Sequence, residues 1–215
     1  MILLGKEIIF PNVETASKQG IVAIGGDLSS ERLILAYKSG IFPWYNEGEP
    51  IIWYSPDPRM VLFPAKLKIS KSMHQVLRKN DFEITFNQNF AEVISQCKTW
   101  ERKDQAGTWI TDEMKIAYMK LHELGIAKSI EVWQNNELVG GLYGIDLGHI
   151  FCGESMFSKV SNASKVAFIH LTRKLEEENY KLIDCQVYND HLASLGAEEI
   201  SRAKFIEILD INVPD

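Results

Sequence analysis

The chain has 215 residues, of which 46% are hydrophobic and 24% are charged. This is the composition of a soluble globular protein with one large domain or two small ones, and it excludes disorder, collagen and coiled coil as descriptions of the whole chain. With 23 basic and 29 acidic side chains the net charge is −6, which taken alone argues weakly against a nucleic-acid partner.

Membrane, secretion and metal signals are weak in this sequence. No apolar run reaches the ~18 residues that a spanning helix needs. The first residues lack the pattern of a signal peptide, so we expect a cytoplasmic protein. Cys97, Cys152 and Cys185 form no Cys-x-x-Cys pair, which argues against a disulfide framework and a structural zinc site. We expect three buried, reduced thiols.

The basic residues are unevenly distributed. Residues 58–80 and residues 155–175 contain no acidic residue. A basic surface on an acidic body suits a polyanion that is held at one place, although solvated helix faces give the same pattern. The basic residues of the two segments are Arg59, Lys66, Lys68, Lys71, Arg78, Lys79, Lys159, Lys165, Arg173 and Lys174.

The first sixty residues differ from the rest. Residues 29–39 have helical spacing and precede Gly40, a residue typical of a helix C-terminus. Residues 41–58 are rich in proline and aromatic residues. Because proline lacks a backbone donor and disfavours helix before it, this segment is predicted to be an extended loop.

Helices and strands alternate from about residue 60 onward. Antiparallel neighbours in a mixed order predict an α+β fold in which helices cover a sheet. The predicted helices are 70–79, 90–100, a helix capped by Thr111 and stopped by Gly125, a long helix from Ser161 or Asn162 to about 179, and a last helix from about Ser201. The predicted strands are 82–86, a hairpin of 126–133 and 138–147, then 149–157 and 181–187.

The strand at 181–187 carries a candidate polar pair. Side chains alternate along a strand, so Asp184 and Gln186 point to one face and Cys185 to the other. A carboxylate and an amide are costly to bury without partners. The pair therefore either belongs to a structural hydrogen-bond network or lines a cavity. A Cys185–His191 thiol nucleophile is disfavoured, because Cys185 points away from that pair.

Glu154 is the unusual residue of the strand at 149–157. It shares a face with Cys152 and Met156, in an otherwise apolar segment. The carboxylate either receives a cation or forms an ion pair with a neighbouring strand. Trp44, Trp53 and Trp109 fall in predicted loops, where a tryptophan fills the core or stacks on a nucleobase.

Nucleotide-binding and metalloprotease motifs are absent from the sequence. The run Gly140–Gly144 lies inside a predicted strand, so close packing or a bulge explains it better than phosphate binding. The hairpin around Asn136–Leu142 resembles the central hairpin of GNAT-type acyltransferases. Residues 158–165 lack the Arg/Gln-x-x-Gly-x-Gly/Ala motif with which such enzymes hold acetyl-CoA, which counts against that cofactor.

Longer strings carry a more specific resemblance, to the leucyl/phenylalanyl-tRNA–protein transferase family, over about residues 20–200. Supporting strings are Gly25–Leu28, Gly107–Ile110 and Ser129–Trp133. The main strings are Gly40–Trp44 with Trp53–Arg59, then Phe151–Ser158, and Leu182–Val187 followed by Asn189–His191 and Ser194–Ala197.

The resemblance implies a bacterial cytoplasmic acyltransferase. Such an enzyme moves leucine or phenylalanine, and less readily methionine, from aminoacyl-tRNA to the N-terminal arginine or lysine of a protein, which is then recognised for degradation. The implied fold is a small N-terminal domain, residues 1–62, and a GNAT-like domain, residues 63–215. The donor is an ester and the product an amide, so no ATP is needed, and we expect no cofactor, no metal and no membrane partner.

Candidate roles follow from the resemblance and from side-chain chemistry. An amide does not accept protons readily, so Gln186 is assigned to orienting the amine or the ester, while Asp184 holds Gln186 and the ammonium group or accepts a proton. The predicted tRNA contacts are Arg59, Lys66, Lys68, Lys71, Arg78, Lys79, Lys159 and Lys165. The predicted substrate-binding residues are Trp44 and Trp109 for the terminal adenosine, Leu142, Phe151, Met156 and Phe157 for the apolar side chain, Glu154 for the acceptor's cation, and Ser158 and Asn189.

Two other interpretations stay open on the sequence alone. One is a GNAT-type N-acetyltransferase that uses acetyl-CoA. The other is a tRNA-binding module without catalytic activity.

Overall fold

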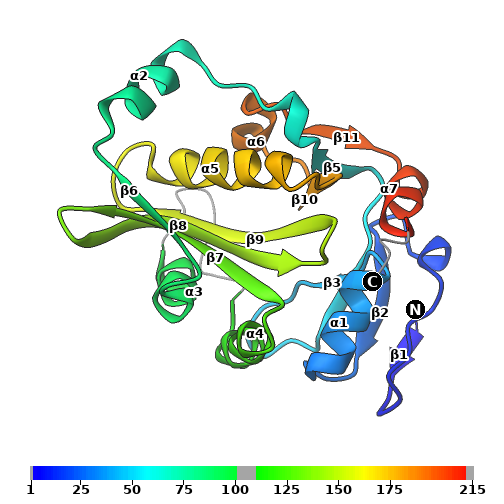
Figure 1. Ribbon diagram of the computed structural model, residues 1–215. Helices are drawn as coiled ribbons and strands as arrows, with labels where there is room; N and C mark the ends of the chain where they lie inside the picture. Colours follow the sequence, from blue (N-terminus) through cyan, green and yellow to red (C-terminus); the bar gives the residue numbers. More distant parts are fainter. Residues whose placement is uncertain (1, 101–109, 212–215) are drawn as a thin grey trace.

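The computed structural model describes residues 2–100 and 110–211. Over these residues the chain forms two sheets with helices around them (Figure 1). The smaller sheet has the order β1 (Ile2–Leu4), β2 (Ile21–Gly25), β4 (Ile52–Tyr54) and β3 (Phe42–Pro43), and α1 (Ser30–Lys38) and the short helix η1 (Val13–Thr15) accompany it.

The larger sheet has seven strands. Its neighbours are antiparallel except for β9 and β10, which run parallel. The order is β11 (Glu198–Ile200), β5 (Arg59–Leu62), β10 (Leu182–Gln186), β9 (Ile150–Ser158), β8 (Glu137–Asp146), β7 (Ala127–Gln134) and β6 (Glu83–Phe86).

Helices cover both faces of this sheet (Figure 1). The helix α5 (Ala163–Glu177) packs on one face, while α3 (Phe90–Thr99) and α4 (Asp112–Glu123) pack on the other. Successive side chains of β8 point to opposite faces of the sheet and so pack in two cores. Leu142 packs in the core beneath α5, and Tyr143 packs in the core beneath α3 and α4. The remaining helices are η2 (Pro64–Lys66), α2 (Lys71–Lys79), α6 (Asp190–Ser194) and α7 (Arg202–Leu209).

The α+β fold class is confirmed. The helices and strands predicted after residue 69 match α2, α3, α4, α5, α7 and β6 to β10 within a few residues. All three cysteines are free and buried, as expected. Close packing also explains Gly140, because a Cβ there would lie 2.5 Å from the Cβ of Ala163 at the start of α5.

The segment from 41 to 58 is more regular than predicted. It contains the short strands β3 and β4, which pair with each other and with β2. Pro43 is tolerated because β3 is an edge strand, where a missing N–H is harmless. The strands β5 and β11 and the helix α6 were not predicted. The division of the chain at residue 62 stays a prediction; β5 (Arg59–Leu62) pairs with β10 and β11 of the larger sheet.

Candidate active site

A cavity opens where β9 and β10 stop pairing. Their last paired residues are Cys152 and Asp184. Just beyond, each strand has a register shift against its other neighbour, at Gly153–Ser155 on β9 and at Asp184–Gln186 on β10. Such bulges turn side chains out of strict alternation. The result is a cavity of about 440 Å³ in the middle of the sheet.

The cavity has an apolar wall and a polar wall. The apolar wall comes from β8, β9, β10 and α5, and the polar one from β9, β10 and the start of α6. A site of this kind suits an apolar group held beside a reacting polar group. The lining includes Leu142, Met156, Phe168, Leu171 and Ile183 on the apolar side, and Glu154, Asp184, Gln186, Asn189 and His191 on the polar side, with Phe42, Pro43 and Trp44 from the smaller sheet and the loop after it.

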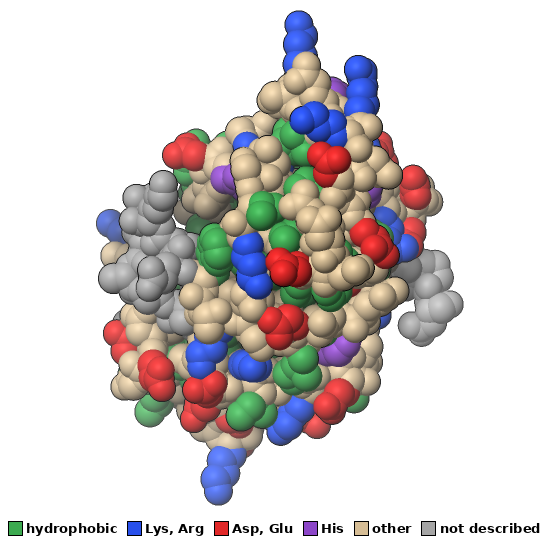
Figure 2. Space-filling model, turned by 90° about the vertical axis from the view of Figure 1, so that its left-hand side faces the viewer, with side chains coloured by type: hydrophobic (Ala, Val, Ile, Leu, Met, Phe, Trp, Pro, Cys, Tyr) green, Lys and Arg blue, Asp and Glu red, His purple; other side chains and the backbone are tan. Residues whose placement is uncertain are grey.

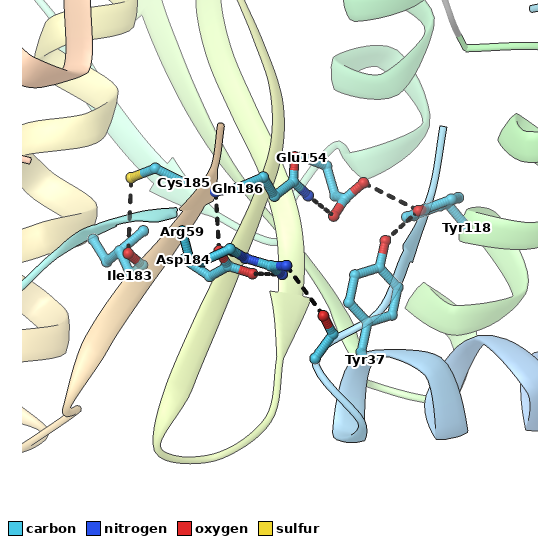
Figure 3. A network of polar contacts seen from close by, with 9 residues as sticks. Tyr37, Arg59, Tyr118, Glu154, Ile183, Asp184, Cys185 and Gln186 are labelled. Carbon is cyan, nitrogen blue, oxygen red and sulfur yellow. Dashed lines mark hydrogen bonds and ion pairs between the residues drawn. The ribbon is translucent and has the colours of Figure 1, made fainter. Parts of the chain in front are cut away.

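Asp184 is held in a buried ion pair with Arg59 (Figure 3). The Nε and Nη2 atoms of Arg59 donate to the two carboxylate oxygens at 2.8 and 2.7 Å. The third guanidinium nitrogen, Nη1, donates to the carbonyl of Gly40 at 3.1 Å. Both side chains are buried, with 0% of Asp184 and 1% of Arg59 exposed. Burial lowers the pKa of Arg59, but the charge and the hydrogen bonds of Asp184, with smaller contributions from Cys152 and Glu154, together raise it above its usual value.

Gln186 sits on the bulge of β10. Its backbone has a φ of +65°, a conformation that costs a non-glycine residue of order 1–3 kcal/mol. The backbone N–H donates to Oδ1 of Asp184 at 2.9 Å, which holds this conformation in place. Its side-chain Nε2 donates to Oε1 of Glu154 at 2.9 Å. Asp184 therefore fixes where the Gln186 amide points.

Glu154 is the second carboxyl group that lines the cavity. Unlike Asp184, it has no cationic side chain within hydrogen-bond distance among the described residues. Its Oε2 accepts from the hydroxyl of Tyr118 at 3.0 Å, and that hydroxyl contacts the hydroxyl of Tyr37 (Figure 3). Burial raises the pKa of Glu154 to about 7, against the lowering effect of these two tyrosines. A carboxyl with this pKa exchanges a proton near neutral pH.

The structure places most of the predicted substrate-binding residues around the cavity. Asp184, Gln186, Trp44, Leu142, Glu154, Met156 and Asn189 line it. Asp184 and Gln186 thus belong both to a structural network and to a cavity wall, the two alternatives that the sequence left open. Trp44 is 38% exposed at the rim. Trp109 lies outside the described residues.

Three predicted substrate-binding residues do not line the cavity. Phe151 packs in the core beneath α5, and its ring lies against Gly144. Phe157 lies on the opposite face of β9, close to Gly141. The hydroxyl of Ser158 donates to the carbonyl of Val160 and accepts from the N–H of Ser164 near the start of α5.

The sequence analysis missed several lining residues. Phe168 and Leu171 stand three residues apart on one side of α5, and Ser164 lies one turn earlier. That spacing was visible as one face of an amphipathic helix, but nothing showed that the face borders a cavity. Strict alternation would put Ile183 on the face opposite Asp184, yet both residues line the cavity, because the ladder ends and bulges there.

Arg59 is a correction to the predicted tRNA contacts. Its side chain is buried in the ion pair with Asp184 and packs between the rings of Phe42 and Phe205, with Cζ 4.9 and 4.5 Å from the ring centroids. It cannot reach a phosphate. Lys66 is exposed but forms an ion pair with Glu198.

The other basic residues of residues 66–79 remain accessible. They lie on α2 and on the turn before it: Lys68, Lys71, Arg78 and Lys79 are exposed. Lys and Arg side chains project at the top of the molecule, where Figure 1 places α2 (Figure 2). Lys159 is exposed and Lys165 is partly buried near the start of α5.

Metal-binding clusters and membrane-spanning helices are both absent from the described residues. Within residues 2–100 and 110–211, no group of three or more His, Cys, Asp or Glu side chains is arranged to hold a metal ion. No helix in the described part of the chain is long and apolar enough to cross a membrane.

Comparison with known proteins identifies the chain. Residues 61–210 match the family model described as leucyl/phenylalanyl-tRNA protein transferase, and residues 26–57 match the model of the N-terminal domain of the same proteins. The chain is therefore an acyltransferase of the aminoacyl-tRNA–protein transferase class. More particularly, it belongs to the leucyl/phenylalanyl-tRNA–protein transferase family.

Similar proteins cover nearly the whole chain. A leucyl/phenylalanyl-tRNA–protein transferase of Flavobacterium johnsoniae is 65% identical over 97% of this chain and 99% of its own length. The protein of the same name from Syntrophobacter fumaroxidans is 54% identical over 99% of this chain and 91% of its own length.

Solved structures are similar only at a distance. The L-PGS structure from Bacillus licheniformis has a TM-score of 0.43 and 13% identity, over 78% of this chain and 54% of that chain. A GCN5-related N-acetyltransferase from Kribbella flavida has a TM-score of 0.39 and 9% identity, over 78% of this chain and 60% of that chain.

Proposed function

We propose that the protein transfers leucine or phenylalanine, and less readily methionine, from aminoacyl-tRNA to the N-terminal arginine or lysine of acceptor proteins. The observation that carries the proposal is the cavity at the end of the β9–β10 pairing, which sets the Gln186–Glu154 pair beside an apolar wall. Membership of the family supports it. We also place the reaction in the cytoplasm, and its product is marked for degradation.

The apolar wall accommodates the side chain of the donor amino acid. Leu142, Met156, Phe168, Leu171 and Ile183 form a surface without charge in a cavity of about 440 Å³. An apolar pocket separates side chains by only ~1–3 kcal/mol per methylene. Overlapping use of leucine, phenylalanine and methionine is therefore the expected behaviour of such a pocket.

The polar wall accommodates the acceptor. The acceptor's α-amino group has an ordinary pKa of about 7.7–8.0, so a useful fraction is neutral at pH 7. Orienting this amine against the ester carbonyl is then the main requirement, and orientation alone contributes ~7–11 kcal/mol to a well-placed reaction. Gln186 orients the amine or the ester carbonyl. Glu154, which accepts a hydrogen bond from Gln186, binds the positively charged group of the acceptor.

Asp184 acts in this proposal through Gln186. Its carboxylate already accepts two hydrogen bonds from Arg59 and one from the Gln186 N–H, and it has no exposed surface. We assign it to positioning the bulge on which Gln186 sits. The sequence also left open a proton-accepting role for Asp184, and we do not assign that role to it.

The tRNA is held outside the cavity. Trp44, at the rim, is the described candidate for stacking on the terminal adenosine, with Trp109 proposed from the sequence. The exposed basic residues of α2, together with Lys68, Lys159 and Lys165, contact phosphates of the acceptor stem without reading its sequence.

One assay tests the proposal. The protein is mixed with radiolabelled leucyl-tRNA and a peptide that begins with arginine, beside the same peptide acetylated at its N-terminus. We expect label on the free peptide and none on the acetylated one. Label on neither peptide would refute the proposal. Acetylation of the free peptide by acetyl-CoA would favour an N-acetyltransferase instead.

A further inference from the structure

Two buried tyrosines from different parts of the chain form a row of hydrogen bonds that ends at the carboxyl group of Glu154. Tyr37 is on α1, beside the smaller sheet, and Tyr118 is on α4, beneath the larger one. They are 2% and 0% exposed. Their hydroxyls contact each other, and Tyr118 donates to Oε2 of Glu154 at 3.0 Å (Figure 3).

Glu154 determines which hydroxyl donates and which accepts in this row of hydrogen bonds. An ionised carboxylate accepts hydrogen bonds and donates none. Tyr118 must then donate its O–H to Glu154 in a hydrogen bond, so Tyr37 must donate its own O–H to the oxygen of Tyr118. On the other side, Gln186 donates to Oε1. Each carboxyl oxygen therefore has a fixed donor, and the carboxyl plane is held in one orientation at the cavity wall.

Packing alone does not explain the two hydroxyls. The ring of Tyr118 meets that of Tyr143 edge to face, with centroids 5.7 Å apart, inside an apolar core. Phenylalanine would fill the same space and bring no polar atom that needs a partner. The hydroxyls therefore have a use, and the group that they reach is Glu154.

We infer that Tyr37 and Tyr118 are positioning residues that hold Glu154 ready to take a proton from the α-ammonium group of the acceptor. This inference rests on the proposed function. The nitrogen loses one proton to Glu154, then attacks the ester carbon and forms the amide bond. The bond between that carbon and the ribose oxygen breaks. A second proton passes from nitrogen to the ribose oxygen, and Glu154 returns the first to water.

The surroundings of Glu154 set its proton affinity. Burial raises its pKa to about 7, the Tyr37 and Tyr118 hydroxyls lower it, the Asp184 charge raises it, and the hydrogen bond from Gln186 lowers it. Arg59 of β5 and Cys152 of β9 also interact electrostatically with it. Tyr143 of β8 and His191 of α6 line the same cavity. Loss of a tyrosine hydroxyl removes a lowering contribution, so the pKa of Glu154 rises.

The test is the pH dependence of kcat/KM for leucyl transfer to an arginine peptide. Below its pKa Glu154 is protonated and cannot accept, so the rate falls as pH falls. Tyr118→Phe should move this acidic limb up by about one pH unit, the size of one hydrogen bond to a charged group. Tyr37→Phe should move it in the same direction, because the Tyr37 hydroxyl also lowers the pKa of Glu154. At pH 9 the variants should approach the unsubstituted rate.

A matched control separates this effect from loss of packing. Tyr45 is 5% exposed and its hydroxyl lies 3.5 Å from Thr111, away from Glu154. Tyr45→Phe should leave the acidic limb in place. Carbon-13 NMR of the glutamate side-chain carboxyls, assigned with Glu154→Gln, gives the pKa without any transfer reaction, and Tyr118→Phe should raise it.

The outcomes distinguish the two proposals. An unsubstituted protein that transfers no leucine would refute the proposed function. An active protein whose Tyr118→Phe variant keeps both the acidic limb and the Glu154 titration unchanged would overturn this inference alone. A lower rate at every pH, with the limb in place, would likewise show that the tyrosines only support the fold.

Discussion

Replacing Asp184 by asparagine tests the ion pair on which the site is built. The substitution keeps the shape of the side chain and removes its charge. It leaves the guanidinium of Arg59 buried with the Gly40 carbonyl and the rings of Phe42 and Phe205 as its remaining neighbours. Breaking a buried ion pair from one side costs ~3–5 kcal/mol, because the other charge stays uncompensated.

That loss is large for a chain of this size. Domains unfold with about 5–15 kcal/mol, and each kcal/mol shifts Tm by roughly 2–4 °C at 150–250 residues. Tm should therefore fall by roughly 6–20 °C for Asp184→Asn. Asp190→Asn is the control, since Asp190 is exposed at the start of α6; it should change Tm by less than about 4 °C.

Urea unfolding without tRNA measures the effect apart from catalysis. The double variant Arg59→Met with Asp184→Leu removes both charges and should recover much of the lost stability, as replaced buried pairs often do. A loss of less than about 1 kcal/mol in Asp184→Asn would refute the reasoning, since that is the size expected for an exposed pair.

Three further predictions concern tRNA binding, the donor pocket and the sheet. Lys71→Glu should raise KM for leucyl-tRNA about 10-fold at low salt and leave kcat unchanged, in steady-state kinetics at two salt concentrations. Lys6 is exposed but distant from α2, so Lys6→Glu should change neither constant. Leu142→Phe fills part of the cavity and should lower kcat/KM for phenylalanyl-tRNA relative to leucyl-tRNA by about 10-fold; an unchanged ratio would remove Leu142 from the pocket. Gly140→Ala should destabilise the protein by about 1–3 kcal/mol in urea unfolding, because its Cβ would meet Ala163, while Gly5→Ala, which meets nothing within 4 Å, should not.

The sequence predicted the regular parts of the fold because their signals are local. The hairpin of β7 and β8 shows alternation on either side of a polar turn, and α4 is capped by Thr111, whose side chain accepts from the Met114 N–H. The strands β5 and β11 are short and lie beside partners far away in the sequence. Nothing within a few residues of Arg59 or Glu198 indicates that pairing.

The candidate site was predicted in composition and not in geometry. Asp184, Gln186 and Glu154 stand out because polar side chains in apolar strands need a reason. Their arrangement depends on two bulges and on a partner, Arg59, that is 125 residues from Asp184. A basic segment gave no sign that one of its arginines is buried. Phe157 was proposed for the pocket together with Met156, although alternation puts the two on opposite faces of the strand, and the structure places Phe157 away from the cavity.

The most direct test of the account compares chemistry with binding in one variant, Gln186→Ala. The account assigns this amide to orienting the reacting groups, away from the basic surface that holds tRNA. In single-turnover transfer from leucyl-tRNA, the rate should fall at least about 100-fold, while Kd for leucyl-tRNA stays within about 2-fold. Equal losses in rate and in affinity would contradict the central claim that the cavity between β9 and β10 is where transfer occurs.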